Sequence, residues 1–204
     1  MVLDNYAKIV SKNLESLYEN LPEGFEAALE AKKVGKEYFF RAFGKNCHIS
    51  PHGIYLNEDK QTGVLGILVS LYALYANHEP CVLEPFKAFK EFGDSMPYVG
   101  AFATHTEQIL SSEVHKIKKF RDKVIDQLDG QDAPVAIPGD FSMVLYPFPK
   151  IALCYIFYDS DEDFQAGVTC LFSSNAPYFM PVDGLADVGE YTSKRILEIV
   201  PQEK

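Results

Sequence analysis

The chain has 204 residues, 47% of them hydrophobic, so it is long enough for one full-sized core and too apolar to be disordered. It has 19 Lys and Arg against 29 Asp and Glu, a formal net charge of −10, which repels a phosphate backbone, and no nucleic-acid partner is expected. The first residues show no secretory signal, and the longest apolar stretch, residues 64–76, is too short to span a bilayer, so no membrane association is expected either.

The four cysteines are widely spaced and form no CxxC pair, so the sequence predicts neither a zinc knuckle nor a cysteine-ligated cluster, and it identifies no cofactor. They are Cys47, Cys81, Cys154 and Cys170. Without an export signal, we expect reduced thiols and a cytoplasmic protein. The one basic cluster visible in the sequence, residues 116–123, is interleaved with acidic residues and predicts the solvated side of a helix.

The first third of the chain predicts helices followed by a small sheet. Apolar residues recur at helical spacing after Asp4, which can cap a first helix, so residues 1–34 are interpreted as a helical appendage or as part of the main domain. Three short runs rich in aromatic and β-branched residues follow, at Tyr38–Phe43, Asn46–Ser50 and Ile54–Leu56, with Gly and Pro between them. They predict an antiparallel meander.

The middle of the chain predicts mainly helices. Residues 64–76 are apolar nearly all round, which indicates a central helix packed on several sides. Val82 and Leu83 predict a brief strand. Two helices are predicted next, at about 101–110 and 112–128.

The carboxyl-terminal third predicts a β-hairpin. The aromatic run Phe141–Tyr158 is followed by the acidic turn Asp159–Asp163 and by a second apolar run, Val168–Phe172. A final helix is predicted at about 185–199. Helices first and strands mostly last predict an α+β fold with antiparallel strands, a carboxyl-terminal β-hairpin packed on helices, and a single domain over residues 1–204.

Several segments occur in an order shared with a known family. They are Leu68–Tyr75 (LVSLYALY), Phe86, the loop ending in Asp140, Pro147–Lys150, Ile156–Phe164 (IFYDSDEDF) and Leu171–Phe172. This order resembles the family catalogued as domain of unknown function 3786, most specifically over Pro149–Phe172. The resemblance implies a cytoplasmic accessory role near one-carbon, corrinoid or tetrapyrrole metabolism in anaerobic bacteria and archaea. The chain lacks the cysteine-rich segment of some members, and its Ser160–Phe164 replaces the family's Gly-Asp-Glu-Glu-Phe turn.

The acidic turn is a candidate cation site. Its carboxylates alternate as at the start of a calcium loop, but Phe164 stands where such a loop needs glycine and Cys170 where it needs glutamate. A solvated hairpin turn is therefore favoured over a cation site, and no metal site is predicted. Because clustered carboxylates repel one another, we expect a nearby cation, for which Arg195 is a candidate.

Cys47, His48 and His52 bring thiol and imidazole groups close together in the sequence. In a strand Cys47 and His48 point to opposite faces, and Pro51 keeps the two histidines off one helix face. A packed cysteine with two surface histidines is favoured over a metal site or a thiol nucleophile.

A pocket for a small planar ligand is predicted between the central helix and the hairpin. The chain has 15 Phe and 12 Tyr, and although most should fill the core, some can line such a pocket. The candidate ligand-binding residues are Tyr72, Tyr75, Tyr155, Phe157, Asp161, Glu162, Asp163 and Phe164.

Three functional hypotheses remain open, because the sequence contains no catalytic motif and no catalytic residue is identified. The first is a non-catalytic binding or accessory protein. The second is a small enzyme that uses carboxylates of the acidic turn for acid–base chemistry, with an apolar neighbour such as Phe164 raising one pKa. The third is a structural subunit whose exposed aromatic residues bind a protein partner.

Overall fold

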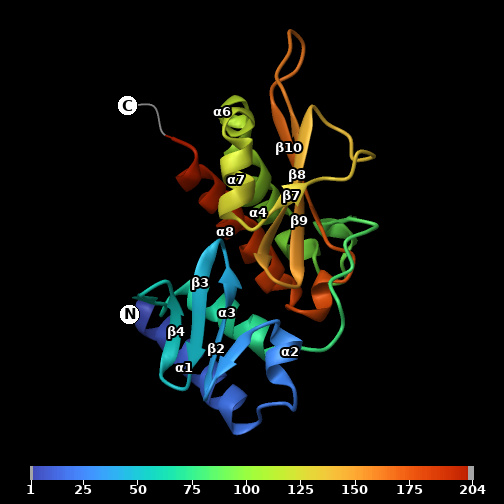
Figure 1. Ribbon diagram of the computed structural model, residues 1–204. Coiled ribbons are helices and arrows are strands. Elements are labelled where there is room, and N and C mark those ends of the chain that lie inside the picture. The colour runs from blue at the N-terminus through green and yellow to red at the C-terminus, as the bar shows by residue number, and fades with distance from the viewer. Residues whose placement is uncertain (1, 202–204) are drawn as a thin grey trace.

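The computed structural model describes residues 2–201, with side chains from residue 5 onward. Two antiparallel five-stranded sheets organise these residues (Figure 1). The first sheet is a meander of β1 (Lys32–Val34), β2 (Glu37–Ala42), β3 (Lys45–Ser50), β4 (Gly53–Leu56) and β5 (Asp59–Lys60). The second has the order β6 (Lys87–Ala88), β10 (Gly167–Phe172), β9 (Ile151–Tyr158), β8 (Phe141–Phe148) and β7 (Gln131–Asp132). The predicted α+β class and the predicted meander are confirmed.

Helices connect and cover the two sheets. The α-helices are α1 (Val2–Glu19), α2 (Phe25–Leu29), α3 (Val64–Leu74), α4 (Val99–Phe102), α5 (Ile109–Ser111), α6 (Val114–Lys119), α7 (Arg121–Gln127) and α8 (Val182–Ile199). Three short 3₁₀ turns are η1 (Phe89–Glu91), η2 (Met96–Tyr98) and η4 (Ala176–Tyr178), and η3 (Ala103–Gln108) is a π-helix between α4 and α5.

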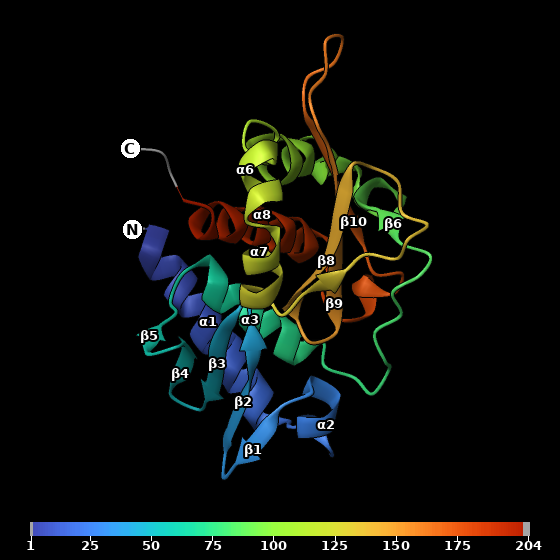
Figure 2. The ribbon, with the colours of Figure 1, turned by 45° about the horizontal axis from the view of Figure 1, so that its top comes forward.

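The first sheet is covered on one face only. Along β2, Tyr38, Phe40 and Ala42 are buried, whereas Phe39 and Arg41 between them are exposed, as expected for a strand with one solvated face. Helices α1 and α3 pack against the buried face and lie behind the strands in Figure 1. The opposite face of the sheet is open, which Figure 2 shows from a second direction.

Helix α3 confirms the predicted central helix, although it ends at Leu74. It buries Leu68, Val69 and Tyr72, and its Ser70 hydroxyl accepts a hydrogen bond from Nδ2 of Asn13 on α1 over 2.8 Å. Both α1 and α2 contribute to the same core cluster as the second sheet. The amino-terminal helices therefore pack into the body of the protein.

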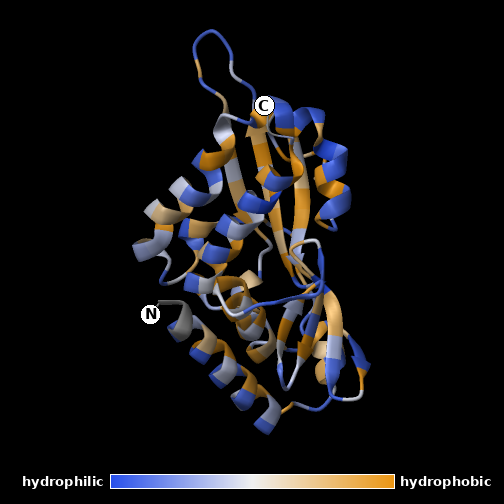
Figure 3. Cartoon of the chain, turned by 90° about the vertical axis from the view of Figure 1, so that its left-hand side faces the viewer, coloured by the Kyte–Doolittle hydropathy of each residue, from blue (hydrophilic) through white to orange (hydrophobic). Residues whose placement is uncertain are grey.

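The second sheet contains the predicted hairpin. Strands β9 and β10 pair along their length, with Tyr155 opposite Cys170. Seven consecutive residues of β9 are buried, because helices cover one face of the sheet and the loops around Phe86 and Ile137 cover the other. Figure 3 shows these strands as a mainly hydrophobic band, and the β9–β10 loop as a hydrophilic projection.

The two sheets meet at the β2–β3 turn. The backbone N–H of Phe43 donates to the carbonyl of Pro147 over 2.8 Å, and the Phe43 ring packs edge-on against Phe148. Phe148 in turn stacks on Tyr72 of α3, with ring centroids 4.5 Å apart. This joint makes one continuous core out of residues from both sheets.

Several predicted element boundaries are wrong. Helix α1 begins at Val2, so Asp4 lies inside it and is not its cap. Residues 82–83 form no strand, because the N–H of Val82 donates to Oδ1 of Asn175 and its carbonyl accepts a single backbone hydrogen bond, from Ser174, so no ladder forms. The helix predicted at 101–110 begins at Val99 and contains the π-helix, and the one predicted at 112–128 is divided at Phe120 into α6 and α7.

Candidate functional site

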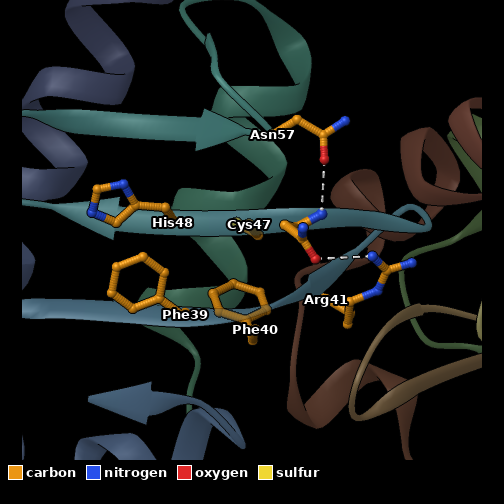
Figure 4. A pocket seen from close by; sticks show the side chains of 7 residues that line it. Phe39, Phe40, Arg41, Cys47, His48 and Asn57 are labelled. Carbon is orange, nitrogen blue, oxygen red and sulfur yellow. Dashed lines mark hydrogen bonds between the residues drawn. The ribbon is translucent and has the colours of Figure 1, made fainter. Parts of the chain in front are cut away.

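Five side chains in register cross the open face of the first sheet. Each strand contributes one residue of this row, which we call the aromatic row: Lys32, Phe39, His48, Tyr55 and Lys60. The Phe39 and His48 rings stack with centroids 4.6 Å apart and planes 6° apart, and His48 and Tyr55 stack at 5.4 Å. Lysines stand at both ends. Phe39 and His48 project from neighbouring strands on the same side of the sheet (Figure 4).

The charge around the aromatic row is opposite in sign to that of the whole chain. Residues 32–60 contain six Lys and Arg against three Asp and Glu, whereas the chain has a formal net charge of −10. One acidic group lies close to the row, since Oε2 of Glu37 is 3.2 Å from Nε2 of His48. This contact is not aligned as a hydrogen bond, and it is an ion pair only when His48 is protonated. The first sheet therefore has an excess of basic residues, of which Arg41 is ion-paired with Asp129 of the α7–β7 connection.

A pocket of about 490 Å³ lies beside the aromatic row. It is lined by Phe39, Phe40, Arg41, Asn46, Cys47, His48 and Asn57. The Arg41 guanidinium is held in place because Nε donates to both carboxylate oxygens of Asp129, while its terminal nitrogens donate to Oδ1 of Asn46 and to the carbonyl of Gly44. These bonds use three of the five N–H groups of arginine, so two remain.

The amide groups in the pocket have a fixed orientation. Oδ1 of Asn46 accepts from the Arg41 guanidinium over 3.0 Å, and Oδ1 of Asn57 accepts from the backbone N–H of Asn46 over 3.2 Å (Figure 4). Both partners can only donate, so the oxygens face them and the NH₂ groups point elsewhere. Within residues 2–201 neither Nδ2 has a hydrogen-bond partner. The pocket thus offers unused donors, which suit an acceptor such as a phosphate or carboxylate.

The eight predicted ligand-binding residues do not meet at one pocket. Tyr72, Tyr155 and Phe157 are buried in the core, and Tyr75 is exposed at the end of α3. Tyr72 of α3 stacks on Phe148 of β8, and both belong to the main core. None of the eight lines the pocket beside the aromatic row. Their role in ligand binding stays a prediction.

The acidic turn is a self-contained, exposed loop. Oδ1 of Asp161 accepts from the backbone N–H groups of Asp163 and Phe164, over 2.9 and 2.7 Å. Such a turn satisfies its own backbone donors, and Glu162, Asp163 and Phe164 face solvent. The geometry favours a solvated hairpin turn over an acid–base site, because none of these residues lines any of the pockets described here.

The prediction that Arg195 pairs with the acidic turn is wrong. Arg195 pairs with Glu198 one turn along α8 and donates to the carbonyl of Phe43, at the joint between the sheets. Lys118 of α6 contacts Asp159 instead. The reason is topological, because the hairpin projects from the body on the side of α6 (Figure 2).

The cysteines occupy packed positions. Cys47, Cys154 and Cys170 are buried, Cys81 is partly exposed, and all four are free thiols. Burial raises the pKa of the Cys154 thiol to about 12 and raises those of Cys47 and Cys170 well above their usual value. No group of three or more metal-ligating side chains occurs in residues 2–201. The prediction of a packed Cys47 is confirmed.

We expect one reactive thiol in the folded protein. Because the thiolate is the nucleophile, a thiol-specific reagent at pH 8 should label Cys81 slowly and leave Cys47, Cys154 and Cys170 unlabelled until urea unfolds the chain. Mass spectrometry of the labelled peptides measures this pattern. The Cys81→Ser variant should lose the native-state label, and fast labelling of any other cysteine would contradict the packing described above.

Sequence reasoning missed most of the aromatic row. The sequence predicts His48 as a surface histidine and indicates no role for Phe39 or Tyr55. The sequence does contain an indication of the row, because buried and exposed positions alternate along β2 and the aromatic residue Phe39 occupies an exposed position. The register that brings the five residues together depends on the turns between strands, which no single strand reveals.

Fold and site together define a class: an α+β protein whose first antiparallel sheet presents a basic, aromatic face beside a pocket of hydrogen-bond donors. The family model named Domain of unknown function (DUF3786) matches residues 20–195, and the chain belongs to this family. No curated protein and no solved structure matches the chain. Among the described residues, no helix combines the length and apolar character needed to cross a membrane.

Proposed function

We propose that this protein is a non-catalytic binding protein that holds a planar, negatively charged ligand on the open face of its first sheet. The observation that carries this proposal is the set of donors left over in the pocket. Asn46, Asn57 and Arg41 line the pocket together with Phe39 and His48, and the Nδ2 groups of both asparagines and two N–H groups of Arg41 have no partner within residues 2–201. A ligand anion accepts from these donors while its planar body packs against Phe39 and His48.

Two classes of small molecule share this chemistry. Nucleotides join a planar base to phosphate, and carboxylated tetrapyrroles join a planar ring to carboxylates. A pocket of about 490 Å³ is within the usual range for ligands of this size. The family resemblance supports an accessory role near one-carbon or tetrapyrrole metabolism, and the four free cysteines support a reducing, cytoplasmic compartment.

The ligand class is tested with matched probes. Flavin mononucleotide and riboflavin have the same planar ring and differ in one phosphate, and uroporphyrin represents the carboxylated tetrapyrroles. We expect flavin mononucleotide or uroporphyrin to raise the melting temperature and riboflavin to raise it less, because only the anions engage the donors. The two anionic probes distinguish the nucleotide and tetrapyrrole sources. No shift with either anion would contradict the proposal.

The location of the site is tested by two pairs of variants. Phe39→Ala should weaken binding of the active probe by roughly fivefold, the value of one aromatic contact, whereas Tyr178→Ala, at an exposed aromatic residue outside the pocket, should leave it unchanged. The double variant Lys32→Gln and Lys60→Gln should weaken binding at low salt more than at high salt, with the exposed Lys12→Gln as its control. Isothermal titration calorimetry measures each affinity. Wild-type binding by Phe39→Ala would place the ligand elsewhere.

A further inference from the structure

The π-helix η3 packs against α8 and β10 in the second half of the protein. The hydroxyl of Ser193 on α8 donates to the carbonyl of Thr106 over 2.7 Å, and the same hydroxyl lies 3.0 Å from the Tyr155 hydroxyl. A π-turn inserts one extra residue and changes the direction of the side chains that follow, and such turns are frequent at functional sites. Here the segment sets Glu107 against the edge of β10.

Only one oxygen of the Glu107 carboxylate accepts a hydrogen bond within residues 2–201. Oε1 accepts the backbone N–H of Cys170 over 2.9 Å. The neighbouring strand β6 is too short to reach this position, since it pairs only with Leu171 and Phe172. Within residues 2–201, Oε2 accepts no hydrogen bond. One oxygen therefore completes the sheet edge, and the other remains available.

Glu107 lines a pocket of about 230 Å³ that is separate from the pocket beside the aromatic row. Its walls are largely apolar and include Phe89, Val99, Phe102 and Ala103. The Phe89 and Phe102 rings stack with centroids 4.5 Å apart, which fixes that wall. Glu107 is the only acidic residue of this pocket and Lys90 the only basic one.

Glu107 is a half-buried carboxylate. Burial raises its pKa, which means that the folded protein disfavours the ionised carboxylate. A raised carboxyl pKa contributes stability at low pH that is lost as the pH rises through it, so the folded state favours the protonated form of Glu107. A glutamine could accept the same Cys170 N–H without this cost. The hydrogen bond at the sheet edge therefore does not require the negative charge.

We propose that Glu107 is the anionic anchor of a second binding site, which takes a small organic ammonium ion with an apolar body. The ammonium donates to Oε2 and neutralises the half-buried carboxylate, and the apolar body packs against Phe89 and Phe102. The small volume of the pocket favours a compact amine over a larger ligand. This site lies on the second sheet and is independent of the function proposed above.

The test uses 2-phenylethylamine and its neutral counterpart 2-phenylethanol as probes for the full chain. We expect the amine to bind at pH 7.5, as measured by saturation-transfer NMR and calorimetry, and the alcohol to bind at least tenfold more weakly. Affinity for the amine should fall as the pH drops through the raised pKa of Glu107. Burial raises the pKa values of the facing Cys170 and Tyr155, so both stay neutral across this range.

The decisive variant is Glu107→Gln, which keeps the acceptor for Cys170 and removes the charge. It should fold, melt at the same or a higher temperature, and bind the amine roughly tenfold to a hundredfold more weakly. Lys90→Ala is the control and should bind the amine as well as the wild type or better, with the same dependence on pH. Equal binding of amine and alcohol, or full binding by Glu107→Gln, would overturn the proposal.

Discussion

The Gly44→Ala variant is expected to lose roughly 3 kcal/mol or more of its free energy of unfolding. Gly44 has a φ of 71°, and a Cβ at this position would lie 1.9 Å from the carbonyl oxygen of Gln127 at the end of α7. Because the obstacle is a backbone atom, no side-chain rotation relieves the clash. The turn would have to move, and with it the Gly44 carbonyl that holds Arg41 in the pocket.

Gly35→Ala is the matched control for this experiment. Gly35 has a φ of 62°, similar to that of Gly44, but a Cβ there would meet nothing within 4 Å. Its substitution should cost about 1 kcal/mol, the strain of a left-handed alanine alone. Urea unfolding followed by circular dichroism gives both values. If the two variants were equally stable, the close approach of the β2–β3 turn to α7 would not explain why position 44 requires glycine.

Phe148→Ala is expected to destabilise the protein by roughly 3 to 5 kcal/mol. The Phe148 ring is fully buried, stacks on Tyr72 and packs edge-on against Phe43, so it contacts α3 and the β2–β3 turn from the second sheet. Its removal leaves a cavity at the joint, where both sides are fixed by secondary structure and cannot collapse easily.

The exposed Phe164 provides the comparison for Phe148. Its ring is 74% exposed in the acidic turn, so Phe164→Ala should change the free energy of unfolding by less than about 0.5 kcal/mol. Thermal and urea unfolding of both variants measure the difference. A Phe148→Ala protein that unfolds in two separate steps would reveal that the joint couples the sheets, whereas near wild-type stability would contradict the packing described here.

Local patterns in the sequence predicted elements well where the physical signal is local. The apolar run of α3, the meander of β2 to β4 and the β9–β10 hairpin each follow from residue spacing and from Gly, Pro or acidic turn residues. The π-helix and the break at Phe120 have no such signal, since neither segment contains a glycine or proline. The π-helix packs against α8 and β10, and α7 packs against α8, so both segments make contacts that are distant in the sequence.

The candidate sites depended on contacts that are distant in the sequence. Asp129 lies 88 positions from Arg41, and Cys170 lies 63 positions from Glu107, so neither pair is visible in a linear motif. Amino-acid composition does not distinguish a buried aromatic residue such as Tyr155 from an exposed one such as Phe39. Only the face of the sheet to which each residue points distinguishes them.

By itself the sequence determined the α+β class, the membership in an uncharacterised family and the position of most strands, because hydrophobic periodicity and turn chemistry act over a few residues. The tertiary structure decided which groups share a face. Register across five strands assembled the aromatic row, and the packing of η3 on β10 placed Glu107 in an apolar pocket. Both depend on long-range pairing, whose energy comes from burial of the whole core and not from any one segment.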